Sequence, residues 1–101
     1  MEFVDVARVG EIPPGQMKGY DIGAKTILIA SYDGNYYAIG GKCTHRQGDL
    51  AKGTLEGNVV VCPRHKSRFD VTTGNRIAGP AKENEPAYEL KIVGDSIRVK
   101  I

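Results

Sequence analysis

The 101-residue sequence contains only two Cys and two His, and it has no Trp. Two Cys can form at most one disulfide, and a cytosolic setting favours metal binding as their use. No apolar run is long enough to cross a bilayer, and the N-terminus lacks the basic start and apolar stretch of a secretory signal. We therefore expect a cytoplasmic protein that has no membrane partner.

Neither sign of charge predominates, since the formal net charge is only +2. No basic stripe with aromatic platforms is present, so the sequence predicts no nucleic-acid partner. Repeats and low-complexity tracts are absent as well. The length suits one hydrophobic core, and we expect a single domain over residues 1–101.

Helical periodicity is missing, and alternation of apolar and polar residues dominates instead. The clearest expected hairpins are residues 26–32 with 35–39 around Asp33-Gly34, and residues 88–92 with 97–101 around Gly94-Asp95. Shorter strands are expected at 3–7, 59–61, 68–71 and 76–77. These patterns predict an all-β fold, a small antiparallel β-sandwich or barrel.

Two short segments, Cys43-Thr44-His45 and Cys62-Pro63-Arg64-His65, use every Cys and His in the chain. Sixteen residues separate His45 from Cys62. Each segment follows an expected strand, so we predict two functional loops, at about 41–50 and 61–70, at one end of the fold. Cys43, His45, Cys62 and His65 are the candidate metal ligands.

Three interpretations of these four residues compete. They could form a structural zinc site, or a [2Fe–2S] cluster with Cys on one iron and His on the other, or buried thiols and surface imidazoles without a metal. Zinc sites usually pair Cys with Cys and His with His at wider spacing. The mixed pairs favour a cluster, because each loop then supplies one ligand to each iron.

The pattern C-x-H, sixteen residues, C-x-x-H resembles the Rieske [2Fe–2S] motif. The resemblance covers almost the whole chain and includes further segments: Asp33-Gly34-Asn35-Tyr36-Tyr37-Ala38-Ile39, Gly48-Asp49-Leu50, Gly53, Ser67-Arg68-Phe69-Asp70, Thr73-Gly74 and Gly79-Pro80-Ala81. It implies a Rieske-type ferredoxin with one [2Fe–2S] cluster per chain. By this resemblance Cys43 and Cys62 would bind one iron, and His45 and His65 the other.

The resemblance also implies that a loop at 78–82 covers the cluster, with an ordinary turn at Gly79-Pro80-Ala81 as the alternative. High-potential Rieske proteins carry a Tyr hydroxyl and an additional cysteine pair beside the ligands. This chain has Phe69 in place of that Tyr and lacks the cysteine pair. We therefore expect a low reduction potential, with Ser67 either donating to the cluster or only stabilising a turn.

Function follows from the same resemblance. It implies a soluble one-electron carrier between a reductase and a redox partner such as an oxygenase, and not an enzyme. The alternative is a Rieske-like small subunit of a larger oxidoreductase of the nitrite reductase type, although such subunits often lack the ligands. Basic residues flank the ligand segments and could dock an acidic partner or form an ordinary solvated face: Lys42, Arg46, Arg64, Lys66 and Arg68.

Overall fold

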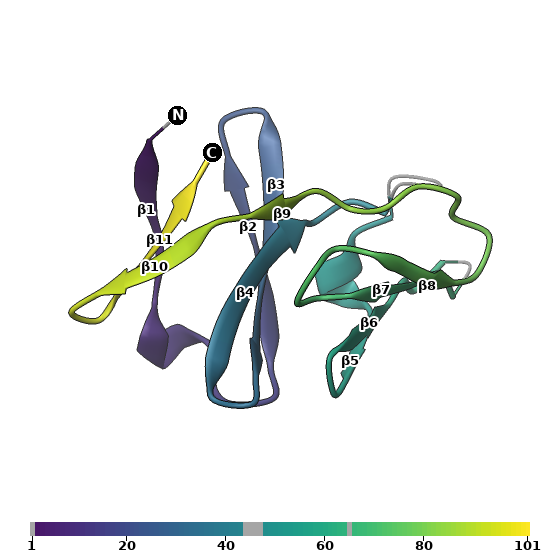
Figure 1. Ribbon diagram of the computed structural model, residues 1–101, viewed down its shortest axis with the longest axis horizontal. Helices are drawn as coiled ribbons and strands as arrows, with labels where there is room; N and C mark the ends of the chain where they lie inside the picture. The colour runs from purple at the N-terminus through teal and green to yellow at the C-terminus, as the bar shows by residue number, and fades with distance from the viewer. Residues whose placement is uncertain (1, 44–47, 65) are drawn as a thin grey trace.

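The fold is described from a computed structural model over residues 2–43, 48–64 and 66–101 (Figure 1). The described strands, in chain order, are β1 (Phe3–Arg8), β2 (Met17–Ile22), β3 (Lys25–Tyr32), β4 (Asn35–Gly40), β5 (Thr54–Glu56), β6 (Val59–Val61), β7 (Arg68–Asp70), β8 (Arg76–Ala78), β9 (Ala87–Tyr88), β10 (Leu90–Val93) and β11 (Ser96–Lys100). They form three antiparallel sheets, ordered β1-β11-β10, β2-β3-β4-β9 and β5-β6-β7-β8. The expected all-β fold is confirmed.

Helical structure in the described residues is confined to two single turns, η1 (Val9–Glu11) and η2 (Leu50–Lys52). Neither turn is long or apolar enough to serve as a membrane-spanning helix. The β5–β8 sheet lies at one end of the molecule, and the other two sheets pack together at the opposite end (Figure 1). Cys43 and Cys62, the cysteines of the expected ligand segments, pack in one core cluster with Val60 and Phe69 of the β5–β8 sheet.

Strand β3 is the centre of the fold because both of its faces are buried. Ile27 and Ile29 pack into one core with residues of β11, whereas Leu28 and Ala30 pack into a second core with residues of β6 and β7. Successive side chains of a strand point to opposite faces, so a strand between two cores must be apolar at every position. This requirement explains the uninterrupted apolar run of β3.

The predicted hairpins are confirmed at their turns. Strands β3 and β4 pair in register around Asp33 and Gly34, which both have positive φ, as a tight two-residue turn demands. Strands β5 and β6 pair around Gly57, and β10 pairs with β11 around Gly94. The N-terminal strand β1 adds to the other edge of β11.

Strand β2 is absent from the sequence prediction. Gly19, inside the strand, weakens the sequence pattern that would predict a strand, but the structure explains why glycine is needed there. A Cβ at Gly19 would lie 3.0 Å from the Cβ of Ala51, so β2 packs closely against the η2 turn. Since η2 directly follows the first predicted loop, β2 helps to position the functional end.

The predicted strand over 88–92 is divided in two. Tyr88 pairs with Ala38 of β4, whereas Leu90 onward pairs with β11 in a different sheet. Strand β10 is also an edge strand, and Ile92 is therefore 45% exposed although its alternation with Lys91 predicts burial. The chain thus crosses between two sheets at Glu89, which alternation alone does not reveal.

Candidate metal centre

The first cluster loop, residues 41–50, is closed by backbone hydrogen bonds beyond the end of β4. The Leu50 N–H donates to the Gly41 carbonyl at 3.0 Å, and the Cys43 N–H donates to the Gly48 carbonyl at 2.7 Å. Asp49 caps η2 by accepting from the Ala51 N–H at 3.1 Å. These bonds hold Cys43 at the start of a short, tightly closed loop.

The second cluster loop, residues 61–70, starts from β6 in the same way. The Cys62 N–H donates to the Ser67 carbonyl at 2.8 Å, and the Lys66 N–H donates to the Cys62 carbonyl at 3.2 Å. In both loops the cysteine N–H therefore binds the carbonyl five positions ahead. The two cysteines thus make the same backbone hydrogen bond, each near the start of its loop.

The two loops meet at the second cysteine. A Cβ at Gly48 would lie 3.1 Å from the Sγ of Cys62 and 3.3 Å from the Cδ of Arg64, so only glycine leaves the sulfur this room. Cys43 and Cys62 are each 2% exposed, belong to one core cluster and are not joined by a disulfide. Two buried, unbridged thiols on adjoining loops are the donor set that one iron of a cluster requires, so the described residues fit it.

The predicted histidine ligands, His45 and His65, lie outside the described residues, as does Arg46 of the predicted basic surface. The structure therefore places the two thiols and leaves the two imidazoles as predictions. Their sequence positions lie within the two cluster loops, two residues after Cys43 and three residues after Cys62.

The 78–82 loop lies against the second cluster loop. The Ala81 N–H donates to the Oγ of Ser67 at 3.1 Å, and both residues are fully buried. Gly79 has a φ of +95°, and a Cβ there would lie 2.5 Å from the Cα of Ser67. The loop thus packs directly on the backbone of Ser67, and that it covers a cluster stays a prediction.

Exposed cations surround the two loops. Lys42, Arg64 and Lys66 are exposed, whereas Arg68 is half-buried and forms an ion pair with Glu56 at 3.1 Å. Because its charge is offset by that carboxylate, Arg68 contributes less to a basic surface than its position in the sequence indicates. The described part of the predicted surface is therefore mainly Lys42, Arg64 and Lys66.

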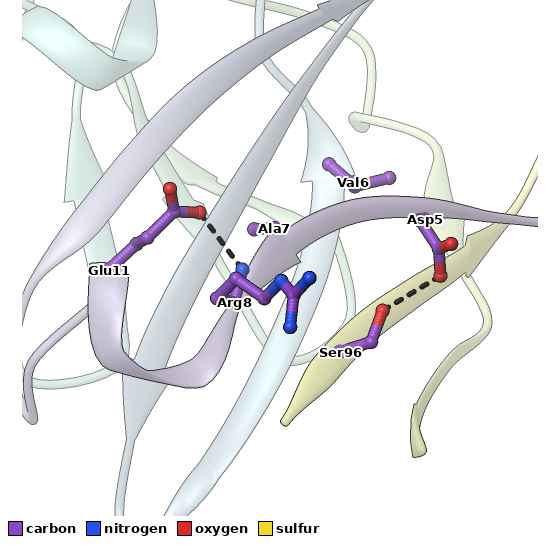
Figure 2. A pocket seen from close by; sticks show the side chains of 6 residues that line it. All are labelled: Asp5, Val6, Ala7, Arg8, Glu11 and Ser96. Atoms are coloured by element: carbon purple, nitrogen blue, oxygen red, sulfur yellow. Dashed lines mark hydrogen bonds between the residues drawn. The ribbon is translucent and has the colours of Figure 1, made fainter. Parts of the chain in front are cut away.

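A polar pocket of about 280 Å³ lies at the opposite end, beside β1 (Figure 2). Its carboxylates already have donors: Asp5 accepts from Ser96 at 2.7 Å, and Glu11 accepts from the Arg8 N–H at 2.9 Å. The Ser96 hydroxyl and then Arg98 lower the pKa of Asp5, and the Arg8 N–H lowers the pKa of Glu11. Both groups are therefore ionised at neutral pH, which does not suit them to donate protons.

Comparison with known proteins identifies the family. The model of the Rieske [2Fe-2S] domain matches residues 2–93. The chain belongs to the Rieske [2Fe-2S] family. This result confirms the resemblance and the expected cofactor, a [2Fe–2S] cluster.

The relatives of this Rieske protein include ferredoxin components of oxygenase systems. It is 32% identical over 100 residues to the ferredoxin component of the naphthalene 1,2-dioxygenase system of Pseudomonas aeruginosa, covering 99% of this chain and 96% of that protein. The solved ferredoxin of carbazole 1,9a-dioxygenase from Nocardioides aromaticivorans IC177 is 29% identical, with a TM-score of 0.91 over 98% of this chain and 97% of that one. The expected class, an electron-carrying ferredoxin and not an enzyme, is confirmed by these relatives.

A second solved structure shows a relative with its partner. A chain of the complex of reduced oxygenase and oxidized ferredoxin in carbazole 1,9a-dioxygenase is 26% identical, with a TM-score of 0.89 over 96% of this chain and 91% of that one.

Two residues at this end of the Rieske protein were missed by the sequence analysis. Glu85 is only 4% exposed, and its Oε1 lies 2.5 Å from where a Cβ of Gly40 would be, which explains the glycine that ends β4. Arg76 binds carbonyls of the 78–82 loop. Neither carries a sequence signal, because each acts on backbone that is close only in the folded chain.

Proposed function

We propose that this Rieske protein is a soluble, cytoplasmic one-electron carrier that passes electrons from a reductase to an oxygenase. The proposal rests most directly on ferredoxin relatives that match nearly the full length of both chains. Full-length ferredoxin relatives also favour a carrier over the small subunit of a larger oxidoreductase of the nitrite reductase type.

Cys43 and Cys62 would hold one iron, and His45 and His65 the other. The support is the equivalent placement of the two buried thiols, each at the start of a loop closed by the same backbone hydrogen bond. When bound, the cluster supplies a one-electron couple, and two neutral imidazoles in place of thiolates raise its potential to between about −150 and +300 mV.

We propose that the reduction potential lies near the bottom of that range. Hydrogen-bond donors near the cluster raise the potential. Phe69 is fully buried in the core cluster that contains both cysteines, and its ring offers no hydroxyl. Ser67 lies within the second cluster loop, its hydroxyl is buried, and its Oγ already accepts the Ala81 N–H.

Stopped-flow mixing of the reduced protein with an oxidised Rieske oxygenase tests the function. We expect loss of the reduced-cluster absorbance together with one-electron reduction of the oxygenase. Voltammetry of the same sample measures the potential. A protein that holds a cluster but transfers no electron to any oxygenase would contradict the carrier, and a potential above about +100 mV would contradict the low-potential assignment.

A further inference from the structure

Arg76 begins β8, and its guanidinium turns back onto the 78–82 loop. Its Nε donates to the Ala81 carbonyl, and its Nη2 donates to the Gly79 carbonyl at 3.0 Å. Its backbone N–H also donates to the Oδ1 of Asn84 at 2.8 Å, beyond the loop. A planar guanidinium holds its donors at fixed spacing, so the two carbonyls are fixed relative to each other.

The far side of the same loop is attached to Ser67. The Ala81 N–H donates to the Ser67 Oγ, so the two backbone groups of Ala81 bind Ser67 on one side and Arg76 on the other. Gly79, the second carbonyl held by Arg76, packs on the Ser67 backbone. Movement of the loop away from Ser67 would therefore break its bonds to Arg76 or displace the arginine.

Ser67 in turn is bonded to Cys62, whose N–H donates to the Ser67 carbonyl at 2.8 Å. The contacts form a continuous series from the Arg76 guanidinium through the 78–82 loop and Ser67 to the backbone of Cys62. We propose that Arg76 is a positioning residue for the metal centre, which holds the 78–82 loop on Ser67 and so fixes the second cluster loop. This inference rests on the proposed ligand role of Cys62.

The series also constrains the Ser67 hydroxyl. Its oxygen accepts from Ala81, so its own hydrogen is directed away from that amide within a fully buried site. Arg76 therefore determines where Ser67 can donate. Loss of the arginine should therefore change how the Ser67 hydroxyl dipole is oriented near Cys62. The effect is indirect, because the series of contacts links Arg76 to Cys62 only through the loop and Ser67.

Hydrogen exchange tests the loop contact directly. In Arg76→Lys the positive charge remains, but the planar fork that binds two carbonyls is lost. Exchange in a peptide spanning 78–84, measured by mass spectrometry on the cluster-loaded protein, should become faster by roughly tenfold. The matched control is Arg98→Lys, whose Nε binds Asp5 at 2.8 Å in the β1–β11 sheet, and it should leave this peptide unchanged. Equal exchange in Arg76→Lys and the parent would overturn the proposal.

The reduction potential tests whether Arg76 acts on the metal centre through Ser67. Arg76→Lys should lower the potential, because the Ser67 hydroxyl is no longer held in one orientation. In a Ser67→Ala background the same change should have little effect, since the connecting hydroxyl is missing. An equal shift in both backgrounds would overturn transmission through Ser67. Iron content of the parent separates the two proposals: an iron-free parent contradicts the metal centre, while the same exchange comparison, made on the iron-free protein, still decides the loop contact.

Discussion

At the scale of single residues, two glycines with positive φ have different reasons to be glycine. Gly34 has a φ of +80°, and a Cβ there would meet nothing within 4 Å. Gly79 has a φ of +95°, and a Cβ would be 2.5 Å from the Cα of Ser67. The first position requires only an unusual backbone conformation, whereas the second also requires the missing side chain.

Alanine substitution should separate these two requirements. Gly34→Ala should destabilise the protein by about 1–2 kcal/mol, the cost of a left-handed alanine. Gly79→Ala should lose about 3 kcal/mol, because overpacking against Ser67 adds to the same backbone cost. Thermal unfolding followed by circular dichroism measures both. Equal losses in stability would show that the 78–82 loop does not pack on Ser67 as described.

Residues also show what the sequence predicts well. The two cysteines stand out as candidate ligands because residue type and spacing limit what they can do, and the structure buries both. Arg76 does not stand out, because an arginine after a Thr-Gly-Asn turn has no defined role until the chain brings carbonyl groups to it. Residue type alone does not predict which side chains will bind backbone groups.

At the scale of elements, β1 and β11 are joined by charged side chains at the edge of a sheet. Asp5 of β1 accepts from Ser96 at 2.7 Å and from the Nε of Arg98 at 2.8 Å, both on β11 (Figure 2 shows the first). These donors lower the pKa of Asp5 from 3.8 in the folded protein. Because the pKa of Asp5 is lower in the folded state than in the unfolded state, its ionised form stabilises the fold at any pH above the unfolded-state pKa. This stability is lost as the pH falls through the folded-state pKa.

Acid titration should show this link. The melting temperature of the parent should fall below pH 3.8, as Asp5 becomes protonated. Asp5→Asn should start from lower stability at neutral pH and lose less on acidification. Ser96→Ala should also flatten the profile, since it removes the largest cause of the lowered pKa. A profile in Asp5→Asn parallel to that of the parent would contradict the assignment.

Elements with strong turns were predicted most accurately. Asp33-Gly34 and Gly94-Asp95 locate their hairpins because few residues accept the backbone conformation of a tight turn. Strand β2 and the break at Glu89 were not predicted, because the first depends on packing against η2 and the second on which sheet edge is available. Both are properties of tertiary structure.

At the scale of the whole molecule, charge is unevenly distributed. Residues 41–82 contain eight Lys or Arg and three Asp or Glu, whereas the rest of the chain contains six and nine. The positive segment includes both cluster loops and the β5–β8 sheet (Figure 1). Such an asymmetry orients a protein as it approaches a charged partner. This asymmetry is the reason to expect an acidic docking surface on the partner.

Charge reversal should test the polarity of this interaction. Lys42→Glu with Lys66→Glu should slow association with an oxygenase by about tenfold at low ionic strength. The difference should vanish near 1 M salt, where the Debye length is about 3 Å. Lys91→Glu on β10 reverses one charge at the other end of the molecule, half the change made by Lys42→Glu with Lys66→Glu, and should have little effect on the association rate. A faster rate in the double variant would show that the partner is basic.

Cys43, His45, Cys62 and His65 are the proposed ligands of one [2Fe–2S] cluster. Pulsed EPR of the reduced protein, with iron and sulfide analysis of the same sample, tests this assignment most directly. We expect two irons and two sulfides per chain and hyperfine coupling to two imidazole nitrogens, one of which is lost in each of His45→Cys and His65→Cys. A cluster without nitrogen coupling, or a chain that binds zinc and no iron, would contradict it.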